Sequence, residues 1–339
     1  MKILGKILAF MRKNKLFLYI KISFLLFCTG NVFSQDIHFS QYYANPLYLN
    51  PAFAGTAICP RVSMNYRNQW PSFSGTYVSY SASYDKFFDK LSGGLGIIFN
   101  SDDAGEGALK TTIVGAMYSY KLPVTRLFSL NMALEASYFQ KKLDWSKLTF
   151  NDMLSPKYGF VYNSKEKQPA NLTKGALDFS AGIFGYGENI YGGAAVHHLT
   201  QPNEGFTIVS PLPMKLTFHL GGIINLEASK KRRRIEDPTL SPNILFMSQK
   251  DYKELNYGLY VNKYPLVGGI WFRQCFKNPD AFVILIGIQK SIFKVGYSYD
   301  VTVSKLSNAS GGSHEISFGT QFKCTQKKKR NRAINCPSF

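Results

Sequence analysis

The sequence predicts an all-β fold, a transmembrane β-barrel of about fourteen antiparallel strands in an outer membrane. Short segments that alternate apolar and polar residues recur along most of the 339 residues, and from Phe293 to Val301 every second residue is apolar. The N-terminus has the pattern of an export signal. Aromatic residues reach 15%, whereas charged residues stay at 18%, below the roughly 25% of soluble domains. A closed barrel in lipid satisfies all three observations.

Residues 1–34 are predicted to be a signal peptide that is cleaved before Gln35. Lysines and arginines precede an apolar stretch over residues 16–33, which ends in Val-Phe-Ser, a small-residue cleavage site. A permanent transmembrane anchor is the alternative. Lys21 interrupts the stretch, however, and its length of about 18 residues falls short of the roughly 20 that a membrane span needs.

Residues 35–60 are predicted to form a periplasmic segment or a plug of the barrel. The dipeptides Asn45-Pro46 and Asn50-Pro51 favour extended or turning backbone, so the segment is neither a regular helix nor a simple strand. Its tyrosine, phenylalanine and proline side chains are suited to filling part of a lumen.

Residues 61–323 are predicted to form the barrel itself, followed by a basic periplasmic tail over residues 324–339. An even number of strands is expected of a single-chain bacterial barrel. One face of each strand is apolar, as at Val78, Tyr80, Ala82 and Tyr84, and the other is polar, as at Ser79 and Ser81. The expected strands begin near Arg61, Thr76, Leu91, Leu109, Leu127, Gly175, Ile190, Met214, Asn243, Glu254, Leu266, Ala281, Ile292 and His314.

The strand count also predicts the sides of the loops. If both termini are periplasmic, connections after odd strands face outward and should be the longer ones. The outward set is residues 102–107, 144–173, 200–213 and 304–313, and the inward set includes residues 85–90, 187–189 and 263–265. The inward connection over residues 229–242 is longer than this rule expects.

The formal charge of +19 comes almost entirely from the signal region and two basic clusters. Zinc-ligand spacing and helix-turn-helix patterns do not accompany the clusters, so nucleic acid is not an expected partner. The clusters are either solvated segments near lipid headgroups or a dock for an acidic periplasmic protein. Their residues are Lys230, Lys231, Arg232, Arg233, Arg234, Lys327, Lys328, Lys329, Arg330 and Arg332.

Catalysis has little support, and we expect neither an enzyme nor a bound cofactor or metal. His197 and His198 are adjacent, so on a strand their side chains point to opposite faces and cannot both bind one metal ion. No Gly-x-Ser-x-Gly motif is present to hold a nucleophile. Four carboxylates on the polar faces are interpreted as ordinary lumen charges alongside Lys215 and Lys294: Glu135, Asp178, Asp300 and Glu315.

Four cysteines remain after cleavage: Cys59, Cys275, Cys324 and Cys336. In an oxidising periplasm, Cys324 and Cys336 are candidates for a disulfide that closes the tail into a small loop. Free thiols are the alternative, because sequence alone does not give the pairing.

The segment over residues 39–55, FSQYYANPLYLNPAFAG, resembles the N-terminal signature of the PorP/SprF family of type IX secretion system outer-membrane proteins. Further similar blocks are YRNQWP at 66–71, YGGAAVHHLTQP at 191–202, SPNILF at 241–246, GYSYDVTVS at 296–304 and GSHEIS at 312–317. These blocks span nearly the whole mature chain. The signature residues are Phe39, Gln41, Tyr42, Asn45, Pro46, Asn50, Pro51 and Gly55.

The resemblance implies an outer membrane of the Bacteroidetes type and a role in secreting or attaching large surface proteins, such as adhesins used in gliding. Expected partners are outer-membrane lipid, periplasmic proteins of the secretion and gliding machinery, and a secreted adhesin-like cargo. A fourteen-stranded lumen is too narrow for a folded domain, so an anchor or adaptor is favoured. A passive small-solute channel is the alternative, because a polar inner face would suit it.

Overall fold

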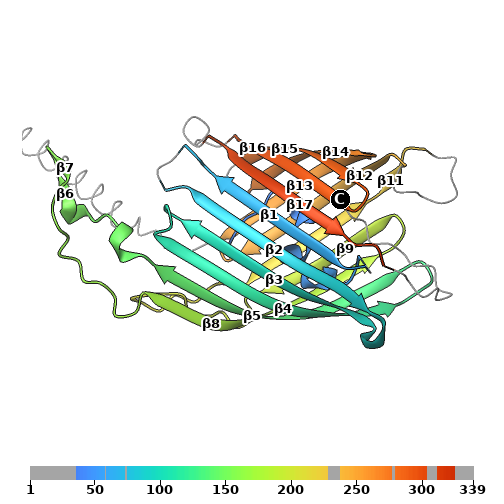
Figure 1. The fold of residues 1–339 in the computed structure, drawn as a ribbon, viewed down its shortest axis with the longest axis horizontal. Coiled ribbons are helices and arrows are strands. Elements are labelled where there is room, and N and C mark those ends of the chain that lie inside the picture. The colour runs from blue at the N-terminus through green and yellow to red at the C-terminus, as the bar shows by residue number, and fades with distance from the viewer. Residues whose placement is uncertain are drawn as a thin grey trace, which may run out of the picture. The chain divides into compact units, whose positions relative to one another are not determined.

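Fourteen antiparallel strands close into one barrel in the computed structural model, which describes residues 36–57, 59–72, 75–227, 237–276, 279–303 and 311–324 (Figure 1). Within those residues, no helix has the length and apolar character to cross a membrane. The barrel strands are β1 (Arg61–Gln69), β2 (Tyr77–Phe88), β3 (Gly93–Ala104), β4 (Leu109–Pro123), β5 (Ser129–Leu143), β8 (Thr173–Tyr186), β9 (Ile190–His197), β10 (Lys215–Gly222), β12 (Thr239–Gln249), β13 (Tyr252–Lys263), β14 (Leu266–Cys275), β15 (Pro279–Lys290), β16 (Phe293–Thr302) and β17 (Ser313–Gln321).

Each strand pairs with its neighbour in the chain, and β1 pairs with β17 to close the cylinder. This seam runs from the pair Arg61 and Gln321 to the pair Gln69 and Ser313. The predicted strand number is therefore confirmed. The largest error is at β12, which begins four residues before the predicted Asn243. The pairing of β12 with β10 ends at Asn243, one residue after Pro242. The missing N–H of Pro242 therefore removes no hydrogen bond to β10.

The strands alternate between a lipid face and a lumen face, as the sequence predicts. Leu134 and Leu177 are 70% and 66% exposed on the outside, whereas Ser81 and Asn65 are buried inside. Strand β15 departs from the pattern because its inward side chains, including Val283 and Leu285, are also apolar. Its lumen face packs against protein and not against water.

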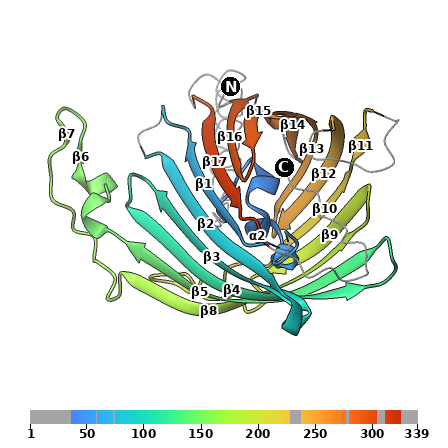
Figure 2. The same cartoon turned by 45° about the vertical axis from the view of Figure 1, so that its right-hand side comes forward.

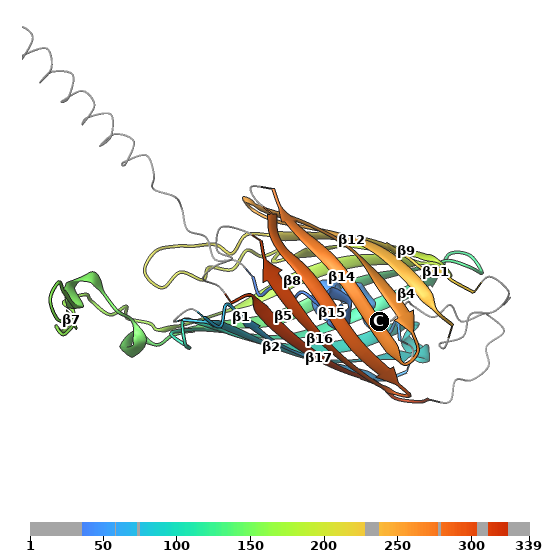
Figure 3. The same cartoon turned by 90° about the horizontal axis from the view of Figure 1, so that it is seen from above.

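The two ends of the barrel differ. At the disulfide rim, where β1 begins and β17 ends, most connections are tight, such as residues 187–189 and 264–265. At the long-loop rim, residues 144–172 and 198–214 form the largest described connections (Figure 3). The first of these carries η4 (Trp145–Lys147), η5 (Asn151–Met153) and a small hairpin of β6 (Leu154–Ser155) and β7 (Gly159–Phe160). At the other rim are η3 (Asp89–Leu91) and β11 (Ile224–Asn225).

Three short helical turns lie inside the barrel (Figure 2). They are η1 (Tyr42–Ala44), α2 (Pro46–Leu49) and η2 (Pro51–Phe53). Prolines occupy the first positions of α2 and η2, where the missing N–H leaves no intrahelical bond unmade. Residues 37–56 are named the plug below.

Candidate functional site

The plug holds every residue of the predicted family signature, and all eight are buried. Leu47, Ala52 and Phe53 join a lumen core with inward aromatic side chains of the wall, including Phe184 and Trp271. The Phe53 and Phe184 ring centres lie 4.2 Å apart. The plug therefore supplies the apolar core that inward apolar side chains of the wall pack against.

Asn50 fixes the plug's second turn and ties it to the wall. Its side-chain Oδ1 accepts from the backbone N–H of Ala52 at 2.9 Å, which caps η2. Its Nδ2 donates to the backbone carbonyls of Ile183 and Ala194 at 3.0 and 3.2 Å. A Cβ atom at Gly182 would come within 2.1 Å of the Asn50 Oδ1, so a larger residue there would displace the Asn50 side chain.

A second close approach joins the end of the plug to β3. Gly55 adopts φ +73°, a left-handed conformation that glycine takes without strain. A Cβ at Gly94 would lie 2.2 Å from the carbonyl oxygen of Ala54. The Gly55 N–H donates to Asp85 at 2.8 Å, and Asp85 also forms an ion pair with Arg61 at 2.8 Å. The last signature residue is thus fixed by backbone contact.

A buried charge cluster holds the start of the plug. Arg67 of β1 lies 2.8 Å from Asp300 of β16 and 3.4 Å from Glu315 of β17. The Ser40 backbone N–H donates to Glu315 at 2.6 Å, and its hydroxyl donates to Asp300 at 2.6 Å. Arg273 of β14 adds a second cation 3.2 Å from Asp300. Opposite charges and hydrogen bonds together hold these buried groups, although Arg67 Nε and Asp300 Oδ1 have no hydrogen-bond partner among the described residues.

The sequence predicted Asp300 and Glu315 as lumen charges but did not single out the two arginines that pair with them. The alternation of side chains along β1 and β14 places Arg67 and Arg273 on the lumen face, and this pattern could have identified them from the sequence. The neighbouring Tyr42 hydroxyl donates to Asn256 at 2.7 Å, and burial raises the pKa of Tyr42 well above its ordinary value. It is a neutral donor at any physiological pH.

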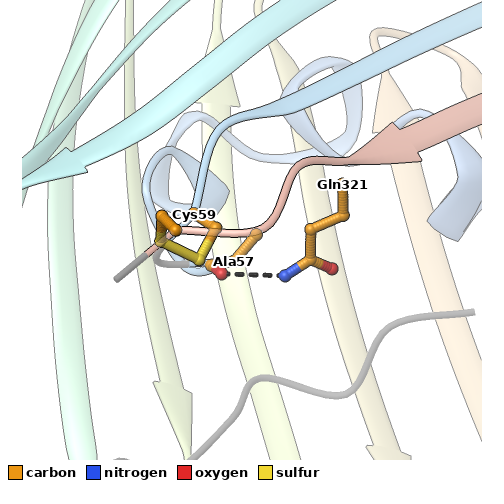
Figure 4. Close-up of a disulfide and its surroundings, with 4 residues drawn as sticks. Ala57, Cys59 and Gln321 are labelled. Carbon is orange, nitrogen blue, oxygen red and sulfur yellow. Dashed lines mark hydrogen bonds between the residues drawn. A yellow bond between two sulfur atoms is a disulfide. The ribbon is translucent and has the colours of Figure 1, made fainter. Parts of the chain in front are cut away.

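The predicted pairing of Cys324 with Cys336 is wrong, because Cys324 is bonded to Cys59 (Figure 4). The seam between β1 and β17 brings these two residues together from opposite ends of the chain. Gln321 also donates to the Ala57 carbonyl at 3.0 Å beside the disulfide. The short spacing between Cys324 and Cys336 favoured a disulfide within the tail, whereas closure of the barrel at the seam brings Cys324 next to Cys59. Cys275 is a half-buried free thiol.

Several predicted features fall outside the described residues. They are the signal peptide, both basic clusters (230–234 and 327–332) and Cys336.

At the long-loop rim, residues 144–172 form the segment named the aromatic arm (Figure 1). Tyr158, Phe160 and Tyr162 are 67%, 61% and 59% exposed. Asp152 joins two parts of the arm, since its carboxylate accepts from the Lys165 N–H at 2.6 Å. That backbone hydrogen bond lowers the pKa of Asp152. Exposed aromatic side chains on a loop are typical of a contact surface.

The neighbouring loop over residues 198–214 is clamped to the wall. His198 Nδ1 lies 2.6 Å from the Asp178 carboxylate, and Thr200 donates to the same carboxylate at 2.7 Å. Lys141 forms a buried ion pair with Glu204 at 2.7 Å. His198 therefore ties this loop to a buried carboxylate of β8. Within the described ranges, no three His, Cys, Asp or Glu side chains gather as a metal-ligand set.

The family model described as "Type IX secretion system membrane protein PorP/SprF" matches residues 31–320. A search of curated protein sequences found no match.

Three solved structures resemble this fold at low sequence identity. The toluene transporter TbuX of Ralstonia pickettii has 10% identity and a TM-score of 0.48, over 82% of this chain and 93% of that one. Omp33 of Acinetobacter baumannii has 9% identity and a TM-score of 0.44, over 79% and 100%. The P. putida toluene transporter TodX has 11% identity and a TM-score of 0.46, over 84% and 95%.

Proposed function

Because the chain belongs to the PorP/SprF family of type IX secretion system membrane proteins, we propose that it is an anchor or adaptor for a large adhesin-like cargo. The protein is an outer-membrane β-barrel. In this proposal it binds the cargo during secretion or surface attachment, and it carries out no chemistry. Gliding proteins of the periplasm are its partners on the inner side.

The plug inside the lumen is the observation that carries the proposal. The plug packs against the wall through an apolar core, the Asn50 contacts and the buried charge cluster. A protein-conducting path would require all three to break. The same packing argues against the small-solute channel, because a conducting pore needs a continuous wet path.

The two rims suit two different partners. We propose that the disulfide rim faces the periplasm and the long-loop rim faces the outside, as the loop lengths favour. The aromatic arm would then meet the cargo through Tyr158, Phe160 and Tyr162. The basic cluster over residues 230–234 would meet an acidic protein of the secretion machinery.

Surface display of the cargo tests the outer contact. Cells that express the triple variant Tyr158→Ser, Phe160→Ser, Tyr162→Ser should lose cargo from their surface, while the amount of barrel stays constant. Val124→Ser is the control, because Val124 is exposed in a connection at the other rim. Normal display by the triple variant would contradict the arm's role.

Conductance separates the adaptor from the channel. The purified protein in a planar bilayer should stay electrically silent, and deletion of its gene should remove cargo from the cell surface. Stable single-channel steps would favour the small-solute channel instead.

Co-purification tests the basic cluster over residues 230–234. Replacing these residues with neutral ones should reduce co-purification of periplasmic partners, and unchanged recovery of the partners would contradict the docking role.

A further inference from the structure

The plug crosses the lumen from one rim to the other. Its start lies at the long-loop rim, where a tight connection joins β12 to β13. There His38 Nε2 is 3.1 Å from Glu254, which is two residues after the start of β13. Its end lies at the disulfide rim, where the Gly55 N–H donates to Asp85 near the end of β2. The chain therefore enters and leaves the lumen at opposite ends of the barrel.

A single strand measures this passage, because β17 runs from the long-loop rim to the disulfide rim. Its third residue, Glu315, accepts from the Ser40 N–H at 2.6 Å. Its last residue, Gln321, donates to the Ala57 carbonyl at 3.0 Å (Figure 4). The two strand residues are six positions apart, which is a rise of roughly 20 Å at about 3.4 Å per residue. A segment that turned back to its own rim would not cover this rise.

The direction of the plug is fixed at its start, its middle and its end. The buried charge cluster holds the start. In the middle, Asn50 donates to carbonyls of β8 and β9, and the Ala52 carbonyl accepts from Ser119 and Asn131 at 3.3 and 3.2 Å. Just after the end, the disulfide bonds the chain to the residue that follows β17 by three positions. The whole crossing is therefore built into the fold.

This crossing decides which side of the membrane each flank of the barrel reaches. Fourteen strands, an even number, return the chain to the rim from which it started. The plug adds one more crossing, so the total is odd. Chain before Ile37 therefore joins the plug at the long-loop rim, whereas chain after Cys324 leaves at the disulfide rim. The expectation that both flanks are periplasmic counts the strands but not the plug.

We propose that the plug threads the barrel in the membrane in this direction and presents the chain before Ile37 on the same side as the aromatic arm. A partner at the long-loop rim then meets two parts of this chain, the arm and the start of the plug, where the His38 side chain is 21% exposed. The partner that fits is the adhesin-like cargo. The proposal rests on the proposed function for that identity and for which rim faces outward. The threading itself does not depend on it.

Maleimide labelling of single cysteines in cells tests the threading. The background carries Cys275→Ser and Cys336→Ser, so that the introduced cysteine is the thiol that reacts. Asp36→Cys reports on the chain just before the plug. Glu166→Cys marks the arm, and Arg126→Cys marks the exposed connection between β4 and β5 at the disulfide rim. The probe is a polyethylene glycol maleimide too large to cross the outer membrane, and its reaction is read as a mobility shift in gels.

Asp36→Cys and Glu166→Cys should both be shifted in intact cells, whereas Arg126→Cys should be shifted only after the outer membrane is permeabilised. Labelling of Asp36→Cys under the same conditions as Arg126→Cys, and not as Glu166→Cys, would overturn the proposal. A reversed pattern, in which only Arg126→Cys reacts in intact cells, would support the threading and contradict the proposed outward orientation of the long-loop rim. The two failures are therefore distinguishable.

A peptide epitope inserted between Gln35 and Asp36 gives a second readout that does not depend on thiol reactivity. Antibody should bind it under the same conditions as an epitope inserted after Glu166. An epitope inserted after Arg126 should bind antibody under the opposite conditions. Folding of every variant is checked by its migration without heating in SDS gels. Antibody binding that follows the Arg126 epitope would overturn the proposal.

Discussion

Replacing Arg67 with methionine should release the start of the plug. Arg67 is 1% exposed and contacts Asp300, Glu315 and the Ser40 hydroxyl, the last at 2.7 Å. Methionine keeps much of the volume but leaves two buried carboxylates short of one cation. Removing one partner of a buried ion pair costs about 3–5 kcal/mol. Arg273 still reaches Asp300, so the lower end of that range is expected.

Hydrogen exchange of the plug measures this cost. Amides of residues 37–56 exchange when the plug opens, so a cost of about 3 kcal/mol should speed their exchange by roughly a hundredfold. The barrel amides should change much less. Lys110→Met is the control, because the Lys110 to Asp103 pair is exposed, is 3.6 Å long and is worth about 1 kcal/mol or less.

The reasoning is refuted if plug exchange in Arg67→Met stays within threefold of the Lys110→Met value. That outcome would mean that the apolar core alone holds the plug. A uniform rise in exchange across barrel and plug would also count against it, because the cluster would then stabilise the whole cylinder and not the plug in particular.

Three further predictions concern the same region. Replacing Cys59 and Cys324 together with serine should destabilise the barrel, since a sequence separation of 265 residues gives the disulfide roughly 5 kcal/mol of chain-entropy stabilisation. The temperature at which the folded band is lost in SDS gels should fall by about 10 °C. An unchanged transition temperature would contradict this prediction. Gly94→Val should prevent the plug from docking, because a Cβ there lies 2.2 Å from the Ala54 carbonyl oxygen, whereas Gly268→Val should fold normally. Protease digestion of the plug distinguishes the two variants. Equal protease resistance would contradict the prediction. Asn50→Ala should destabilise the plug by about 1–3 kcal/mol, because the carbonyls of Ile183 and Ala194 and the N–H of Ala52 lose their hydrogen-bond partner. Faster hydrogen exchange of the amides near η2 would report this loss. Exchange as slow as in the wild type would contradict the capping role.

Alternation predicted the barrel because lipid outside and polar groups inside impose a period of two on every strand. Predicted starts at Arg61, Leu109, Ile190 and Leu266 coincide with the observed ones. The prediction is weaker where the inner face is not polar. Strand β15 is apolar on both faces since it lies between lipid and plug, and periodicity carries no information in such a segment.

Long-range pairing explains most of what the sequence did not give. Ser40 contacts Asp300 across 260 residues, and Cys59 is bonded to Cys324 across 265. Neither spacing follows from a local pattern, because the first contact depends on where the plug meets β16 and the disulfide depends on which strands meet at the seam. The eight signature residues were identified by resemblance, and their physical reasons appear only with the wall in place: Asn50 beside Gly182, and Gly55 against Gly94.

The inner surface of the barrel wall is apolar where it contributes to the lumen core, as at Phe184, Leu245 and Trp271. Without the plug, the barrel would therefore expose these apolar side chains to water in the lumen, while lipid covers the outer face. The N-terminal segment is therefore part of the hydrophobic core of the barrel, and it keeps water from the apolar side chains of the wall. Any cellular agent that withdrew it would have to supply an equally apolar substitute.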